Sequence, residues 1–163
     1  MDHGWYRYLK HHTLVPVPNR PDQDFDALAQ DLDAFVITGG DDSTLRRSTE
    51  LHLARLMMQN HKPTLGVCHG CFLLTDVLGG RVEEITGHMD TEHDVQYLGL
   101  SQRVNSFHSL AVTQPHNGAQ ILATDDHGHC EAWIDGYLAG VVWHPERMPT
   151  PWLPSEISIL LKV

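Results

Sequence analysis

The sequence predicts an α/β fold in which helices flank a mostly parallel central sheet. Two short apolar runs, residues 33–38 and 64–67, end in glycines or in a cysteine–glycine turn. A stretch with apolar residues at helical spacing follows each run, and this strand–helix alternation is typical of a parallel sheet covered on both faces. The composition fits one globular domain over residues 1–163, because 41% of the residues are hydrophobic and 20% are charged.

The first half of the chain carries further local signals. Trp5, Tyr8 and Leu9 recur at helical spacing and predict a short first helix. Residues 14–18 predict a short strand, placed at a sheet edge because two of them are prolines. A second helix is expected over residues 25–32. A long helix is expected from about residue 44 to residue 60, after the N-cap candidates at 41–43.

Beyond Gly80 the pattern changes to short strands separated by turns. Asn117-Gly118, residues 126–128 and Asp135-Gly136 supply turn chemistry. A final helix is predicted from Ser155 to Leu161. The strands are expected at residues 81–85, 93–98, 110–113, 120–125, 130–134 and 138–143.

Charge and cysteine content exclude several classes of protein. The net charge of −10 argues against a nucleic-acid-binding protein, which needs a basic surface. No apolar run is long enough for a transmembrane helix, and the N-terminus lacks a signal-peptide pattern. Three cysteines without a CxxC motif favour a reducing compartment, so we expect a cytoplasmic protein without nucleic-acid or membrane partners.

Cys68 lies where the run 64–67 gives way to a helical pattern, next to His69 and Gly70. Small neighbours allow a sharp turn that exposes the sulfur, and the helix N-terminus is expected to lower the thiol pKa. This arrangement resembles a nucleophile elbow with cysteine in place of serine. The alternative is a cysteine that is merely buried at a strand end.

His144-Pro145-Glu146 follows the apolar strand candidate at 138–143, and Gly39-Gly40 follows the one at 33–38. Residues just past the carboxyl ends of parallel strands line the functional crevice, so both segments are expected to meet Cys68 there. His144 can then take the thiol proton while Glu146 orients the imidazole. The backbone N–H groups of Gly40 and His69 can form an oxyanion hole. Taken alone, His144 is equally explained as a surface or capping residue.

These segments resemble a known family. Thr38-Gly39-Gly40, the run from Gly66 to Gly70 and Trp143-His144-Pro145-Glu146 resemble the signature segments of class I (triad) glutamine amidotransferases. Residues 104–112 and Cys130-Glu131-Ala132-Trp133 resemble the γ-glutamyl hydrolase branch, as does the opening from residue 2 to residue 19. The resemblance covers nearly the whole chain and implies a flavodoxin-like amidotransferase fold.

The resemblance also implies roles for individual residues. Cys68 would be the nucleophile, His144 the general base and acid, and Glu146 the orienting carboxylate. No cofactor is implied, and the reaction would pass through a γ-glutamyl thioester formed from a small γ-glutamyl substrate or glutamine. Gly40 and His69 would supply the oxyanion N–H groups. The expected substrate-binding residues are Gly39, Phe72, Asn105, Ser106, His108 and His93.

Two features depart from the family pattern. Phe72 stands where the family usually has a glutamine that helps to hold the substrate, so the amino-acid end is held differently or the substrate is not plain glutamine. The chain begins directly in the tryptophan-containing segment, so the usual first strand is expected to be lacking. Its place would be vacant, filled by another segment or paired with a second copy, unless the gene model is truncated. A homodimer is therefore one expected partner arrangement.

Three functions remain open at this stage. The preferred one is a stand-alone cysteine hydrolase that cleaves a γ-glutamyl amide and releases glutamate with an amine or amidate. The alternatives are a glutaminase subunit that supplies ammonia to a separate synthetase, and a catalytically inactive binding module. Arg46-Arg47 is either an exposed helix face or an attractor for an anionic leaving group. No metal site is predicted, because the histidines at 11–12, 88 and 93, and 127 and 129 lack a tight structural-zinc ligand set.

Overall fold

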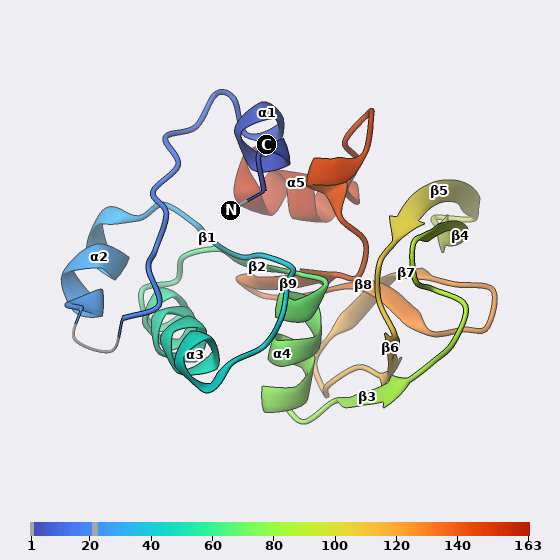
Figure 1. The fold of residues 1–163 in the computed structure, drawn as a ribbon, viewed down its shortest axis with the longest axis horizontal. Helices are drawn as coiled ribbons and strands as arrows, with labels where there is room; N and C mark the ends of the chain where they lie inside the picture. The colour runs from blue at the N-terminus through green and yellow to red at the C-terminus, as the bar shows by residue number, and fades with distance from the viewer. Residues whose placement is uncertain (1, 21–22) are drawn as a thin grey trace.

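A computed structural model describes residues 2–20 and 23–163, and its arrangement is shown in Figure 1. The helices are α1 (Gly4–Tyr8), α2 (Phe25–Asp31), α3 (Thr44–Gln59), α4 (His69–Val77), η1 (Pro145–Arg147) and α5 (Ser155–Leu161). The strands are β1 (Phe35–Ile37), β2 (Thr64–Val67), β3 (Arg81–Glu84), β4 (Thr91–Tyr97), β5 (Leu100–Ser106), β6 (Leu110–Gln114), β7 (Gln120–Thr124), β8 (Cys130–Asp135) and β9 (Leu138–Val141).

The strands form one mixed sheet in the order β1-β2-β9-β8-β7-β4-β5, and β3 joins it through β6, which pairs with β8. Among the described residues, β1–β2 and β2–β9 are the parallel pairs, and the other pairs are antiparallel. The α/β class is confirmed, but the sheet is mixed rather than mostly parallel. The reason is the short turns after α4, because tight turns can join only antiparallel neighbours.

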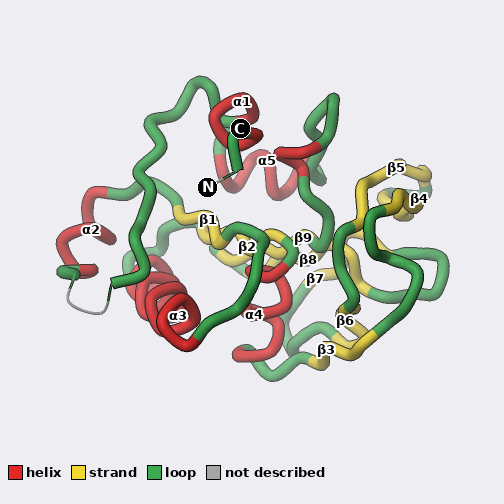
Figure 2. The backbone as a smooth tube through the Cα atoms, viewed as in Figure 1, coloured by secondary structure: helices red, strands yellow, loops and turns green. Residues whose placement is uncertain are grey.

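Helices lie on both sides of the strands β1, β2 and β9. Figure 1 shows α3 and α4 on one side and α1 and α5 on the other, and Figure 2 shows the strands between them. α4 packs against β2 and β9, while α3 packs against β1 and β2. Leu53 and Met57 of α3 and Ile157 of α5 are fully buried, so both layers contribute to the core. This burial holds the parallel strands, and therefore their carboxyl ends, in fixed positions.

Two sequence predictions about strands need correction. Residues 14–18 form no strand, although Leu14 and Val17 pack against the core; two prolines there leave the segment few N–H donors for a sheet. β5 was not predicted as a strand of its own. Its hairpin turn from β4 is formed by Leu98 and Gly99, both with positive φ. A leucine in that conformation carries no recognisable turn signal.

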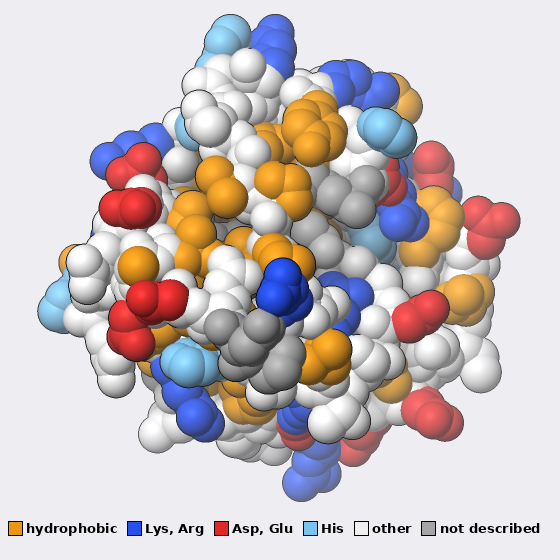
Figure 3. Space-filling view, turned by 60° about the vertical axis from the view of Figure 1, so that its left-hand side comes forward, with side chains coloured by type: hydrophobic (Ala, Val, Ile, Leu, Met, Phe, Trp, Pro, Cys, Tyr) orange, Lys and Arg blue, Asp and Glu red, His pale blue; other side chains and the backbone are white. Residues whose placement is uncertain are grey.

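β1 hydrogen-bonds to β2 alone within the described part of the chain, so it is an edge strand. Figure 3 turns the left side of the molecule toward the viewer and shows hydrophobic side chains gathered near the middle of this face, with charged ones around them. A homodimer through this edge stays a prediction. Within the described residues, no helix is both long and apolar enough to cross a membrane.

Candidate active site

The carboxyl ends of β1, β2 and β9 bring three predicted segments together. The strands are neighbours, with Ile37 opposite Gly66 and Val67 opposite Val141. Cys68 follows β2 directly, and its N–H donates to the Val141 carbonyl at 2.9 Å. Gly39 follows β1 in the chain and lies so close to the His144 ring that a Cβ added there would be 2.3 Å from Cε1. The glycine is thus required for the imidazole to reach its position.

The turn at Cys68 has the geometry of a nucleophile elbow. Cys68 has φ 50° and ψ −105°, a conformation that L residues rarely adopt and that is found at functional turns. The turn is tight, because a Cβ at Gly66 would lie 2.4 Å from the Gly70 carbonyl carbon, and one at Gly70 would lie 2.3 Å from the Ile37 carbonyl oxygen. Close approach of strand and helix therefore explains both glycines.

The state of the thiol differs from the sequence expectation. Burial raises the pKa of Cys68 to about 11, and the hydrogen bond from the His69 backbone N–H lowers it by less. The prediction that the helix N-terminus lowers the pKa below its ordinary value is therefore wrong, because removal of the thiolate from water has the larger effect. Cys68 is a thiol at neutral pH in this state, so its attack on a carbonyl needs a base.

His144 and Glu146 form a buried pair that can supply this base. The Nδ1–H of His144 donates to Oε1 of Glu146 at 2.8 Å, and both side chains are almost fully buried. Because Nδ1 is the donor, Nε2 remains available to accept a proton. Within the described residues, no hydrogen bond links His144 to Cys68, and such contacts often tighten only when substrate binds.

Neighbouring segments hold this pair in place. The Asn105 side chain of β5 accepts from the His144 N–H and donates to the His144 carbonyl, both at 2.8 Å. From α1, Arg7 donates to the Glu146 carbonyl at 3.3 Å, and Gly4 lies so close that a Cβ there would be 2.2 Å from that oxygen. The segment from His144 to Glu146 is therefore fixed from both sides through its main chain.

Sequence reasoning missed a chain of polar contacts from α3 to the elbow. Glu50 accepts from His69 Nε2 at 2.9 Å and from Arg46 Nε at 2.7 Å. Arg46 in turn donates to the backbone carbonyls of Thr38 and Asp41. The i, i+4 spacing of Arg46 and Glu50 was the available signal. The Arg46 guanidinium is thus hydrogen-bonded to the loop that carries Gly39 and Gly40 and to Glu50. Because these contacts occupy it, the hypothesis that Arg46 attracts an anionic leaving group is not supported.

The comparisons with known proteins agree with this geometry. Residues 3–159 match the family described as glutamine amidotransferase class-I. The chain belongs to this family. It is 28% identical over 152 residues to the glutamine-hydrolyzing GMP synthase subunit of Sulfurisphaera tokodaii, with 86% of this chain and 79% of that protein covered. It is 35% identical over 96 residues to anthranilate synthase component 2 of Archaeoglobus fulgidus, with 54% of each protein covered.

A solved structure supports the amidotransferase fold. The crystal structure of a protein described as a GMP synthase subunit, from Thermoplasma acidophilum, has a TM-score of 0.76 over 98% of this chain and 85% of that one, at 16% identity. The named relatives are parts of synthases, so they do not support the γ-glutamyl hydrolase branch that the sequence motifs predict. The coarser assignment to the class I family is confirmed.

The substrate-binding residues predicted for this amidotransferase lie in two places. Asn105 lines a groove of about 700 Å³, together with Phe107, Arg103 and Arg147. Phe107 was not predicted, but its ring stands edge-on to His144 at 5.7 Å, and the Arg147 guanidinium lies over it at 5.2 Å. This groove therefore opens beside His144.

The other predicted substrate residues lie deeper in the amidotransferase. Ser106 is fully buried, His108 is 3% exposed, and Phe72 is 7% exposed with its ring 6.0 Å from His108. His93 lies in the same cluster, on β4. A substrate reaches these side chains only if neighbouring groups move, so their contact with substrate stays a prediction. The roles of Gly39, Gly40 and His69 in binding the reacting carbonyl also stay predictions.

Proposed function

We propose that this chain hydrolyses the γ-amide of glutamine at Cys68 and supplies the ammonia to a separate synthetase. The observation that carries the proposal is the buried His144–Glu146 pair, hydrogen-bonded at 2.8 Å next to the Cys68 elbow. The relatives support this role, since their names describe a glutamine-hydrolysing subunit of one synthase and component 2 of another. The preference for a stand-alone γ-glutamyl hydrolase is therefore replaced by the alternative from the sequence.

The chemistry follows from the site. His144 Nε2 takes the proton of the Cys68 thiol as the sulfur attacks the γ-carbonyl carbon, which forms a C–S bond and places negative charge on the carbonyl oxygen. The N–H groups of Gly40 and His69 stabilise that charge. When the C–N bond breaks, His144 gives its proton to the departing nitrogen, and ammonia leaves. Water, deprotonated by His144, then attacks the thioester and releases glutamate and the free thiol.

Phe72 favours a second candidate function. An aromatic ring cannot make the polar contact that the family's usual glutamine makes. The Phe72 side chain is buried, and its ring packs beside that of His108. A γ-glutamyl conjugate with a larger leaving group would depend less on that contact. The second candidate is therefore a hydrolase that releases glutamate from a γ-glutamyl amine or amidate.

Glutamate release measured by mass spectrometry separates these functions. The purified chain is given glutamine or a panel of γ-glutamyl amines and amidates, alone and mixed with the ammonia-accepting subunit of a GMP synthase. Hydrolysis of glutamine that increases with the added subunit is the expected result. Release from one conjugate but not from glutamine would support the second candidate.

Cys68→Ala is the matched control, and it must abolish release from whichever substrate is used. If activity survives in this variant, the nucleophile assignment is wrong. No release from any substrate, with glutamine binding retained in calorimetry, would overturn both enzymatic proposals in favour of a binding module. Phe72→Gln tests substrate recognition, and it should raise kcat/KM for glutamine if Phe72 weakens the hold on its amino-acid end.

A further inference from the structure

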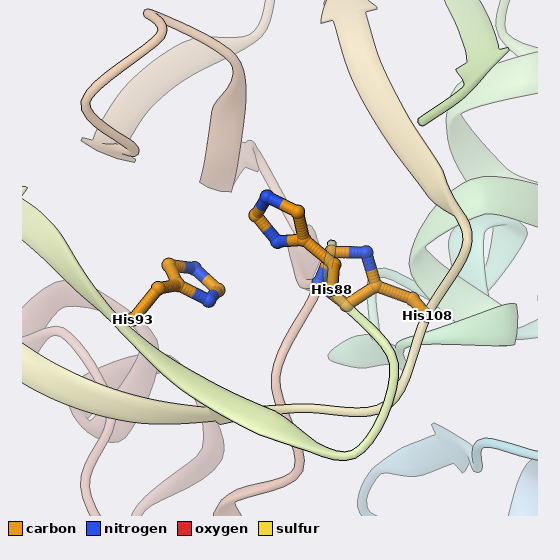
Figure 4. A group of neighbouring side chains, drawn as sticks. All are labelled: His88, His93 and His108. Carbon is orange, nitrogen blue, oxygen red and sulfur yellow. The ribbon is translucent and has the colours of Figure 1, made fainter. Parts of the chain in front are cut away.

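Three histidines meet in the antiparallel part of the sheet. Figure 4 shows His88 from the loop before β4, His93 from β4 and His108 from the connection between β5 and β6. One ring nitrogen of each lies within 4.8 Å of those of the other two. The His88 ring is centred 4.8 Å from that of His93 and 5.0 Å from that of His108. Segments that are distant in sequence thus place three imidazoles around one point.

A buried carboxylate faces this cluster without a hydrogen bond of its own. Glu131 of β8 is 1% exposed, and its Oε2 lies 3.3 Å from His93 Nε2. Within the described residues, neither Glu131 oxygen and neither His93 ring nitrogen has a hydrogen-bond partner. Buried polar side chains in proteins nearly always have a hydrogen-bond partner, so this unpartnered carboxyl group suggests that a further group belongs in the cluster.

The hydrogen bonds of His108 leave one of its ring nitrogens as an acceptor. His108 Nδ1–H donates to the Leu110 carbonyl at 2.7 Å, which leaves Nε2 with a lone pair. Ser106 Oγ lies 3.0 Å from that Nε2, but it also lies 2.7 Å from the His88 carbonyl and has one proton for both. A histidine that binds a metal ion through one ring nitrogen commonly donates the N–H of its other ring nitrogen to a backbone carbonyl, as His108 does to Leu110.

We propose that His88, His93 and His108 bind a divalent transition-metal ion of the zinc type, with Glu131 beside His93 as the carboxylate that orients this ligand. Imidazole ligands suit zinc, whereas magnesium and calcium prefer oxygen ligands. Zn–N bonds of about 2.0–2.1 Å in a tetrahedral site separate the nitrogens by roughly 3.3 Å. The ring nitrogens lie within 4.8 Å of one another, so they need to approach by up to about 1.5 Å, through rotation of the histidine side chains.

The proposed ion would have a structural role. It would join the loop before β4, β4 itself and the β5–β6 connection, which carry its three histidine ligands. β5 also carries Asn105, whose side chain holds the main chain of His144. Binding is therefore expected to make the β4–β5 hairpin more rigid and to steady the position of the catalytic histidine. Phe72 of α4 packs against this cluster, with its ring 6.0 Å from that of His108.

A second group of possible ligands serves as the comparison. Asp125, His127 and His129 also lie within ligand distance of one another. Here the Asp125 oxygens accept from the His127 N–H, the His129 N–H and His129 Nδ1 at 2.8–2.9 Å. Its carboxylate is therefore already partnered, and His127 is exposed to water. This group is explained by the loop that it shapes.

Zinc binding to the metal-free full chain tests the proposal. The chain is titrated with Zn²⁺ against a chromophoric chelator, and Co²⁺ is used in parallel for its tetrahedral absorption bands. We expect one tightly bound equivalent. His93→Ala should lower the affinity by more than roughly tenfold, as should Glu131→Gln, which keeps the side chain's shape. His88 is half-buried in a loop, so His88→Ala is expected to fold and should also lower the affinity. This variant keeps the proposal testable even if His93→Ala does not fold.

His127→Ala and the double variant His11→Ala/His12→Ala are the matched controls, and neither should change the binding. Hydrogen exchange provides a second readout, because Zn²⁺ should slow exchange in β4 and β5 of the unaltered chain and not of His88→Ala. The proposal is overturned if no stoichiometric binding occurs. It is also overturned if binding survives His88→Ala and His93→Ala, or if the control variants abolish it, since either result would mean an adventitious ion only.

Discussion

The histidines at the ends of β2 and β9 are each hydrogen-bonded to a carboxylate, whereas the buried histidine and carboxylate that face each other between β4 and β8 are not. His144 is bonded to Glu146, and His69 to Glu50. In contrast, His93 and Glu131 have no hydrogen-bond partner within the described residues. The parallel part of the sheet thus holds its predicted catalytic groups through contacts within the chain. The antiparallel part contains a buried histidine and carboxyl group without such contacts, beside the proposed metal ion.

The difference follows from how each part is built. Three strand ends meet at one edge with close glycine contacts at Gly39, Gly66 and Gly70, and they fix the predicted catalytic groups through the backbone. The histidine cluster instead depends on side chains from a loop, a hairpin and a distant strand. Backbone packing specifies positions more firmly than loops do, so the first region is organised in advance and the second is adjustable.

The largest expected effect tests whether the parallel region alone carries the chemistry. His144→Ala should lower kcat for glutamate release on the order of 10⁴-fold, because it removes the base that Cys68 needs and the acid for the leaving nitrogen. Steady-state kinetics would measure the loss. His127→Ala, an exposed histidine of the antiparallel region, is the control and should leave kcat unchanged. Similar losses in both variants would remove the distinction between the two regions.

The next effect concerns the ionisation of Cys68. Its pKa is raised to about 11 by burial, so the reactive thiolate is scarce at neutral pH and increases tenfold with each pH unit up to that value. Pulsed alkylation with iodoacetamide, followed by mass spectrometry, should accelerate roughly 1,000-fold between pH 7 and pH 10. In Cys68→Ala, any remaining alkylation comes from the two other buried cysteines, so this variant gives the background rate. Fast alkylation that does not change from pH 6 to pH 9 would mean that His144 already holds the proton.

A smaller effect tests the glycine contacts of the elbow. In Gly70→Ala the new Cβ would meet the Ile37 backbone oxygen, and overpacking of this kind should lower the free energy of unfolding by about 2–3 kcal/mol. Gly128→Ala is the matched change in the antiparallel region, where nothing lies within 4 Å and only the positive φ is strained. The free energy of unfolding should fall by about 1 kcal/mol in Gly128→Ala. Urea denaturation would measure both, and equal losses would contradict the role given to close packing.

The smallest expected effect concerns the polar chain from α3. Glu50→Gln removes the charge that joins His69 to Arg46, and it should lower the free energy of unfolding by about 1–2 kcal/mol. Asp76→Asn breaks an exposed ion pair with Arg47 and should change it by less than about 0.5 kcal/mol. Thermal and urea unfolding would compare the two variants. A larger loss in Asp76→Asn would show that the Glu50 contacts do not stabilise the elbow.

Much of the fold was predictable because its signals are local. The apolar runs of β1 and β2, the Ser43 cap of α3 and the turns after Gly80 are each read from a few neighbouring residues. The hairpin turn at Leu98-Gly99 was missed, since a leucine there has no turn preference. The segment at 14–18 has the apolar residues of a strand, but its two prolines deprive it of hydrogen-bond donors, and that lack has the larger effect.

For the site, the sequence by itself determined which residues stand at the ends of β1, β2 and β9, and Cys68, His144 and Glu146 followed from that rule. Only the tertiary structure decided the ionisation of Cys68, because burial is a property of the whole fold. It alone also brought Glu50 to His69, and Glu131 to His93. Such contacts join elements that are far apart in the chain, and no short-range pattern specifies which distant side chain will meet which.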